Sequence, residues 1–287
     1  MRRIVAILAV GLAAAAGRAD DGPVTVKVKQ SGVGDRVKES RTETATNKVS
    51  FTVMGMEQNK EDKVTTKFVY TDEIVEKPAG AKRPTKLKRT YETAEMTKDG
   101  DKVDLGLVGK TVTVEKKGSG YDIKVDGQEP TGPGGDLLKK EFNKEKQLND
   151  EDLLPKDPVK VGGTWKVDLT KLAEDASDEL DIDVPKSTGT GKLIKVYDKD
   201  GHKFGVVEIT LDVALNKIGP AGQTVELKPG SKLQITATLD SCIDGSKAET
   251  TGKMAVKGAF TGTAMGIELK FDLQSQRDGA SVEVGKK

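Results

Sequence analysis

The chain of 287 residues is poor in the side chains that build most metal and catalytic centres, with one histidine, His202, and one cysteine, Cys242. Two such residues cannot furnish a structural zinc centre, and a single cysteine forms no internal disulfide. General-base catalysis near neutral pH most often uses histidine, but His202 lies in the sequence DKDGHKFG, which is typical of a solvated hairpin turn. We therefore predict no catalytic residues, no metal ligands, no cofactor and no Cys242–His202 dyad.

Aromatic residues are also scarce, at 4% of the chain, and the charges of the two signs nearly cancel. Beyond the first 19 residues, 44 basic side chains stand against 46 acidic ones, interspersed along the sequence. The chain thus lacks the basic surface that binds phosphates and the aromatic platforms that stack on bases or sugars. This composition excludes nucleic acid as a partner and disfavours a carbohydrate enzyme.

No apolar run reaches the roughly 20 residues that a membrane-spanning helix needs. The apolar stretch over residues 4–16 follows Arg2 and Arg3 and precedes the small residues Gly17 and Ala19, a pattern typical of a secretory signal peptide. We predict a signal peptide over residues 1–19 and an exported protein, periplasmic or secreted, that does not span the membrane. A lipid anchor would need a cysteine at the cleavage site, and Cys242 is far from it.

Residues 20–130 alternate between apolar and polar side chains with a period of two, which predicts strands with one buried face. The expected strands include residues 24–29, 49–53, 64–70 and 103–107. Turn signals that contain glycine, which tolerates a positive φ, separate them at Gly100, at 116–120 and at Gly127. We predict an N-terminal β meander of six or seven strands.

Residues 131–186 change character and predict a connector with short helices. A cluster of proline and glycine over 130–135 precedes Asp136, which we expect to cap a helix over 136–147. A second short helix is expected after Asp168, with its leucines facing inward. The acidic residues that follow it lack the central glycine and terminal glutamate of a calcium loop, so we interpret them as a hydrated linker.

Residues 187–287 show the clearest alternation and predict a second β meander. Its apolar faces are expected to be Val207, Ile209, Leu211, Val213 and Leu215, then Leu233, Ile235, Ala237 and Leu239, then Met265, Ile267, Leu269, Phe271 and Leu273. Asp-Gly pairs at Asp200 and Asp244 predict tight hairpins. Cys242 lies opposite the apolar set of its strand, where we expect a half-exposed thiol.

Together these patterns predict a mainly β protein of antiparallel meanders, with one or two short helices in the middle. The strands could form a sandwich or a curved half-barrel, and the two meanders could be one domain or two. A curved sheet with a helical lid encloses an apolar cavity, whereas a tight sandwich does not.

The order of leader, meander, breaker, helix and second meander, with the motif PVKVGGTW over residues 158–165, resembles an exported bacterial β-rich family of unknown function. That family has no established activity, and its motif has the form PVxVGxxW. More loosely, the layout is similar to periplasmic lipoprotein carriers of the half-barrel kind, although no ligand residue of theirs is matched here. We expect Trp165 to be a core anchor, and the ligand-binding residues stay unknown at this stage.

Our leading hypothesis is an exported, non-catalytic binding module for a lipid, another apolar ligand or a cell-envelope protein. In it, the apolar faces of Val207–Val213 and Ile267–Phe271 would line a cavity, with the helix over 136–147 as its lid. The alternative is a structural or interaction protein of the envelope without a cavity. A hydrolase that uses paired carboxylates is the third hypothesis.

Overall fold

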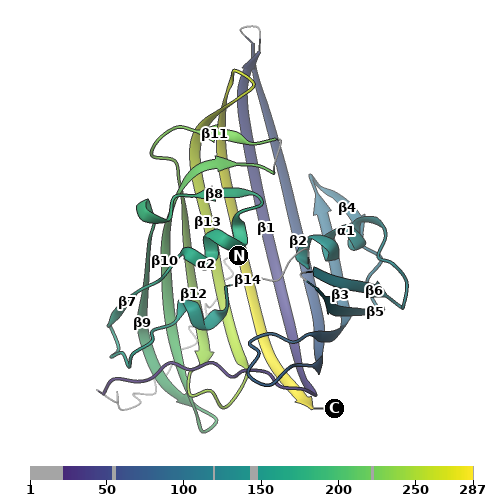
Figure 1. Ribbon diagram of the computed structural model, residues 1–287, viewed down its shortest axis with the longest axis vertical. Coiled ribbons are helices and arrows are strands. Elements are labelled where there is room, and N and C mark those ends of the chain that lie inside the picture. Colours follow the sequence, from purple (N-terminus) through teal and green to yellow (C-terminus); the bar gives the residue numbers. More distant parts are fainter. Residues whose placement is uncertain (1–21, 54–55, 119, 143–147, 221–222, 287) are drawn as a thin grey trace, which may run out of the picture.

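The computed structural model describes residues 22–53, 56–118, 120–142, 148–220 and 223–286. The predicted signal peptide lies outside these residues. Within them every strand belongs to one antiparallel sheet, which confirms the mainly β prediction (Figure 1). The chain therefore does not form two separately paired sheets, as a sandwich would. No described helix is long and apolar enough to cross a membrane.

The N-terminal meander has six strands, as expected. They are β1 (Asp35–Val53), β2 (Met56–Glu76), β3 (Lys86–Lys98), β4 (Asp101–Asp104), β5 (Thr111–Lys117) and β6 (Gly120–Val125). The connector contains α1 (Gly132–Glu141), η1 (Asp150–Leu153), β7 (Thr164–Lys166), α2 (Thr170–Ala176), β8 (Leu180–Ile182) and η2 (Val184–Lys186). The C-terminal meander contains β9 (Thr188–Lys199), β10 (His202–Ile218), β11 (Val225–Leu227), β12 (Lys232–Cys242), β13 (Glu249–Ala264) and β14 (Ile267–Lys286).

The two meanders are joined into one sheet by the pairing of β1 with β14. The strand order runs β6-β5-β3-β2-β1-β14-β13-β11-β10-β9-β7, while β12 also pairs with β10 and β13, β4 with β3, and β8 with β10. Because β1 pairs with β14 over almost its whole length, the first and the last strand lie side by side in the middle of the sheet.

Two of the predicted turns have the positive φ angles that their Asp-Gly sequences favour. Asp99-Gly100 joins β3 to β4, Asp200-Gly201 joins β9 to β10, and all four residues have positive φ, between 52° and 96°. Such paired positive φ angles match the twist of a two-residue hairpin, and aspartate and glycine tolerate them. At Asp244-Gly245 the predicted hairpin is present, since β12 pairs with β13, but its turn is not tight, because residues 243–248 form a longer loop.

The predicted position of Met265 is also wrong. The residue was expected on the apolar face of a strand, but it is the first residue of the turn between β13 and β14, with a φ of 50° and 98% of its surface exposed. Alternation alone misplaced it, because Met265 continues the apolar period that Ile267 and Leu269 begin on the other side of the turn.

The N-terminal segment and the first helix also differ from expectation. Residues 24–29 form no strand and make only isolated bridges, from Val24 to Val159 and from Lys27 to Asp244. Helix α1 begins at Gly132 with Pro133 in its first turn, so Asp136 lies inside the helix and is not its cap. Proline is well suited to the first turn of a helix, where its missing N–H has no partner to lose. The helix ends at Glu141, and residues 143–147 lie outside the described part.

Two apolar cores lie on the same face of the sheet, which we call the inner face. Core 1 packs β9, β10, β12 and β13 against the connector residues Val167 and Leu169. Core 2 packs β2, β3, β5 and β6 against Leu138 of α1, together with Leu105 and Leu107. These two leucines were expected on a strand, but β4 ends before them, and they are buried beside α1.

Candidate functional site

The two long central strands of the sheet contain few buried residues. Among the described residues of β1 and β14, only Asp35 is buried, although these strands lie between the two cores. Helices α1 and α2 lie over the two flanks of the sheet, with β1 between them (Figure 1). The inner face of β1 and β14 is therefore the surface that the fold leaves partly open.

A charged belt crosses this open centre. The guanidinium of Arg277 donates to the Glu43 carboxylate from Nε and Nη2, at 2.9 and 2.7 Å. Beside it the Arg41 guanidinium lies 5.2 Å from the ring centroid of Phe68, a residue of core 2. Two hydrogen bonds from one guanidinium to a carboxylate fix both side chains in place. The belt thus places the Glu43–Arg277 ion pair, with the Arg41 guanidinium over Phe68 beside it, between the two cores.

Beyond the belt, toward the hairpin ends of β1 and β14, the inner face is apolar. We call this set the apolar strip: Val49, Phe51, Leu269, Phe271 and Leu273, all of them half-buried. Register places Val49 opposite Phe271 and Phe51 opposite Leu269. The ring of Phe271 lies 5.5 Å from that of Phe260, a buried residue of core 1. The strip is therefore a partly exposed extension of core 1.

The predicted cavity lining divides between two environments. Val207, Ile209, Leu211 and Val213 are buried in core 1, each 5% exposed or less, and the connector packs against them. Helix α1 does not cover them, because it packs on core 2 at the other flank, so the expected helical lid is wrong. Leu269 and Phe271 belong to the half-open strip, and Ile267 is 37% exposed.

A pocket of about 370 Å³ lies at the edge of core 2, and sequence reasoning missed it. The buried Arg89 is at its base, with the Asp72 carboxylate at 2.8 and 2.9 Å and Glu141 at 2.8 Å. The guanidinium stacks 3.8 Å above the ring centroid of Tyr70. Burial alone would lower the pKa of Arg89, but the two carboxylates raise it well above its usual value, so the cation is permanent.

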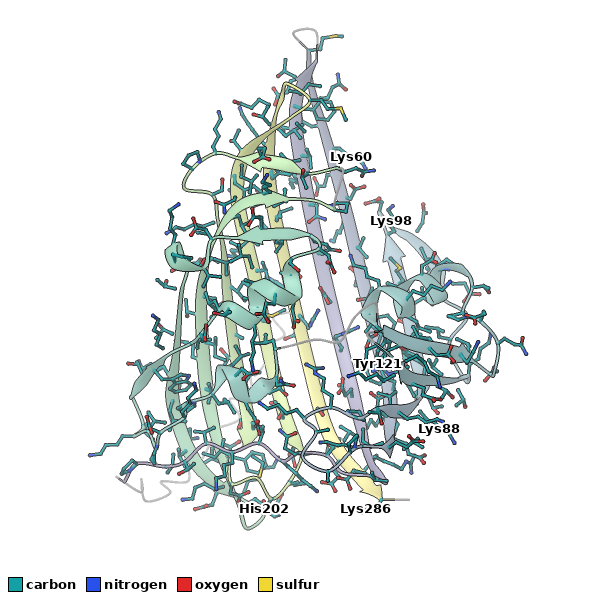
Figure 2. All side chains as sticks on the ribbon, in the orientation of Figure 1. Lys60, Lys88, Lys98, Tyr121, His202 and Lys286 are labelled. Atoms are coloured by element: carbon teal, nitrogen blue, oxygen red, sulfur yellow. The ribbon has the colours of Figure 1, made fainter. Side chains whose placement is uncertain are left out.

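The same pocket contains a carboxyl group with a raised pKa. Burial raises the pKa of Glu39, whose carboxylate accepts a hydrogen bond of 2.6 Å from the Tyr70 hydroxyl. Tyr121, on the side of this flank that faces the long central strands, completes the aromatic lining (Figure 2). Since Arg89 is ion-paired with both Asp72 and Glu141, the pocket is built around an internal cation rather than around a free acid–base pair.

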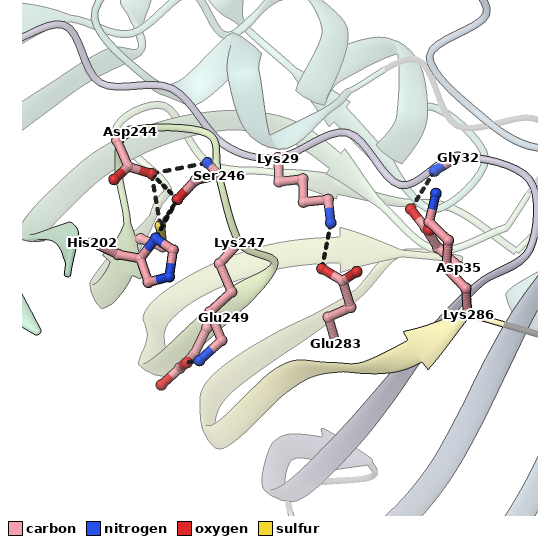
Figure 3. A network of polar contacts seen from close by, with 11 residues as sticks. Lys29, Gly32, Asp35, His202, Asp244, Ser246, Lys247, Glu249, Glu283 and Lys286 are labelled. Atoms are coloured by element: carbon pink, nitrogen blue, oxygen red, sulfur yellow. Dashed lines mark hydrogen bonds and ion pairs between the residues drawn. The ribbon is translucent and has the colours of Figure 1, made fainter. Parts of the chain in front are cut away.

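The two residues weighed as a dyad lie in one polar cluster at the lower end of the sheet (Figure 3). His202 contacts the Ser246 hydroxyl through Nδ1 at 2.7 Å, and the Cys242 thiol donates to Asp244 at 3.1 Å. Ser246 donates to Asp244 from both its hydroxyl and its backbone N–H. These bonds, led by those from Ser246, hold the pKa of Asp244 well below its usual value.

This arrangement is not that of a catalytic triad. In a triad, histidine takes the proton of the nucleophile and the aspartate orients the histidine, whereas here the serine proton points to Asp244. Cys242 is 1% exposed, so the expected half-exposed thiol is wrong. In the N-terminal segment, Lys27 forms a β-bridge with Asp244 of this cluster. Lys29 forms a 2.5 Å ion pair with Glu283 of β14 (Figure 3). The cluster therefore fastens this end of the sheet.

Trp165 packs against core 1 as expected, but it is half-buried at the edge of that core rather than inside it. Its indole N–H donates to the Leu153 carbonyl at 2.9 Å, and its ring lies directly over Gly191 of β9. Helix α2 follows Asp168 with Leu169 buried, which confirms the second predicted helix. Among the described residues, which include the acidic ones of α2 and its exit, no group of three or more metal-binding side chains converges.

The opposite face of the sheet carries a shallow groove of about 560 Å³ across β2, β1, β14, β13 and β12. Small residues form its floor, among them Ser40, Thr42, Gly252, Gly279 and Ala280. The groove has no buried charged group, and its rim residues Lys253 and Asp278 lie 3.6 Å apart as an exposed ion pair. It offers little to hold a ligand in one orientation.

The chain was compared with known families, curated proteins and solved structures. No family model matches it, and no curated protein matches it either. Among solved structures, a lipovitellin structure on lipid–protein interactions is similar over 89% of this chain and 26% of its own, with 9% identity and a TM-score of 0.37. The chain thus spans about a quarter of that protein.

Two other structures are more distant. An outer membrane channel from Pseudomonas putida F1 aligns over 90% of this chain and 98% of its own, with 10% identity and a TM-score of 0.21. A DUF1329 family protein from Desulfovibrio piger aligns over 82% and 84%, with 10% identity and a TM-score of 0.13. At these scores the similarity carries no functional argument, so the interpretation of the site depends on its own geometry.

Proposed function

We propose that the protein is an exported, non-catalytic binding module that holds an apolar ligand on the apolar strip. The observation that carries the proposal is that Val49, Phe51, Leu269, Phe271 and Leu273 are only half-buried, at the centre of a sheet whose flanks are well covered. Contiguous exposed apolar surface on a soluble protein marks a binding site more often than chance exposure does.

The dimensions of the strip favour an elongated ligand such as a lipid chain. From Leu269 to Leu273 the strand advances about 14 Å, at ~3.4 Å per residue. The charged belt with Glu43 and Arg277 closes one end of the strip, and there a polar head group could meet charged side chains. Each apolar side chain that the ligand covers would contribute roughly 25 cal/mol per Å² of buried surface.

The absence of catalysis is part of the proposal. Lys60, which pairs across the sheet with Val49 of the strip, forms an ion pair with Asp62, Arg277 forms one with Glu43, and Arg89 forms ion pairs within its pocket. The cluster around Cys242 and His202 directs its serine proton to a carboxylate and not to a base. Each of these arrangements stabilises the fold without leaving a reactive group free.

The test is uptake of a fluorescent fatty acid by the delipidated mature protein in vesicle-free buffer. We expect saturable binding, weakened about tenfold or more in the variant Val49→Thr/Phe51→Thr, which places threonine, a residue of high strand propensity, at both positions but removes apolar surface. The matched control is Ser50→Ala/Thr52→Ala on the opposite face of β1, which should bind like the wild type. Equal affinity in both variants would place the ligand elsewhere, and no uptake by the wild type would favour a structural role in the envelope.

A further inference from the structure

Three exposed large apolar side chains lie where β13 ends and where β2 and β14 begin, whereas the exposed Val284 is at the other end of β14. Met265 is 98% exposed, Met56 63% and Ile267 37%. Phe51 of β1 pairs with Leu269 of β14, and Val53 pairs with Met56 of β2, so the adjacent ends of these three strands are neighbours. They lie at the upper end of the longest axis (Figure 1). We call Met56, Met265 and Ile267 the hairpin tip.

The backbone at Met265 is as unusual as its exposure. Its φ of 50° and that of 77° at Gly266 are those of the turns at Asp99-Gly100 and Asp200-Gly201. Aspartate tolerates this conformation because its short polar side chain bonds locally, whereas a long apolar side chain is strained there. Met265 therefore combines a strained backbone with full exposure to water. Neither property helps the isolated fold, which points to a role outside it.

We propose that the hairpin tip inserts into the surface of a lipid bilayer. A stable protein interface buries about 800 Å² on each partner and requires a complementary shape, and a tip of three apolar side chains at the narrow end of a sheet does not provide it. A bilayer requires only protruding apolar groups. Methionine suits this task because its side chain is long, flexible and polarisable.

The charges behind the tip indicate the kind of membrane. Glu57 and Lys60 follow Met56 on β2, and Glu268 and Lys270 follow Ile267 on β14, so both signs are equally represented. Lys60 lies toward this end in Figure 2. With no excess of basic residues, attraction to anionic lipids contributes little, and apolar insertion sets the affinity. We expect binding to neutral phosphatidylcholine vesicles that changes little with salt.

The decisive variant is Met265→Asp, which installs the Asp-Gly pair that the other hairpins of this chain use. It should fold at least as well as the wild type, yet float with phosphatidylcholine vesicles about tenfold less, the effect of losing one buried apolar side chain. Met265→Leu keeps an apolar side chain and should still float. Val108→Asp removes an exposed apolar side chain beside core 2, away from the hairpin tip, and should float like the wild type.

Three results would overturn the proposal. They are a wild type that does not float, a Met265→Asp variant that floats equally well, and a Val108→Asp variant that loses as much binding. A wild type that stays off vesicles but forms Met265-dependent dimers in sedimentation would assign the tip to self-association instead. The inference does not depend on the proposed ligand, because Val49→Thr/Phe51→Thr should lose fatty acid in vesicle-free buffer and still float.

Discussion

The contact between Trp165 and Gly191 permits a quantitative test of how the connector is fastened to the sheet. A Cβ atom added at Gly191 would lie 2.1 Å from Cε2 and 2.4 Å from Nε1 of Trp165. Real side chains do not approach so closely, so Gly191→Ala must displace the indole or β9. Displacement breaks the hydrogen bond from Trp165 to Leu153, worth about 0.5–1.5 kcal/mol, and adds about 1–3 kcal/mol of overpacking. We expect a loss of about 2–4 kcal/mol in the free energy of unfolding.

Urea unfolding followed by circular dichroism measures this loss, and emission of the single tryptophan reports the displacement directly. We expect a lower midpoint and a red shift for Gly191→Ala. Gly120→Ala is the control, because nothing lies within 4 Å of its added Cβ, and it should change stability by less than about 0.5 kcal/mol. In the background Trp165→Leu, the effect of Gly191→Ala should largely disappear. Unchanged stability and emission in the single variant would refute the contact.

Three further predictions concern charge and export. Arg89→Met leaves the carboxylates of Asp72 and Glu141 without their partner and should cost about 3–5 kcal/mol in denaturant titration; a loss under ~1 kcal/mol would contradict the buried ion cluster. Because burial raises the pKa of Glu39 above its unfolded value, its contribution to stability is complete below the unfolded pKa and is lost as pH rises through the folded one. Glu39→Gln keeps the hydrogen-bond acceptor and removes this contribution, so the free energy of unfolding of the variant should rise relative to that of the wild type between acidic and neutral pH, and a pH-independent difference would argue against it. Intact mass of envelope-derived protein should show a mature chain that begins at Asp20, whereas one that retains Met would rule out cleavage.

The parts of the fold that local patterns control could be predicted from the sequence. The alternation over Val207–Leu215 predicted one buried face, and all five apolar residues of that face are buried. Asp200-Gly201 predicted a tight hairpin because its preference for positive φ is local chemistry. The second short helix and the packing of Trp165 against core 1 follow from equally local signals.

The rest depends on contacts between residues far apart in the sequence. Nothing in β1 or β14 alone indicates that they pair, and this pairing turns two meanders into one sheet. Arg89, Asp72 and Glu141 come from β3, β2 and α1, and each resembles a hydrated surface charge in its own segment. Met265 was misplaced for the opposite reason, because a turn residue happened to continue an apolar period.

The pairing of β1 with β14 also explains why an open centre is compatible with a stable sheet. Both strands are paired on both edges, so their backbone groups are satisfied without a covering layer. Apolar burial is then concentrated in the flanking cores. The ion pair between Glu43 and Arg277 adds cross-strand attraction between β1 and β14. A ligand on the apolar strip would add burial where the sheet has least, and its stabilisation would grow as RT ln(1 + [L]/Kd). The centre of the sheet contributes least to the apolar cores, and it is therefore the part where a bound ligand would add the most burial.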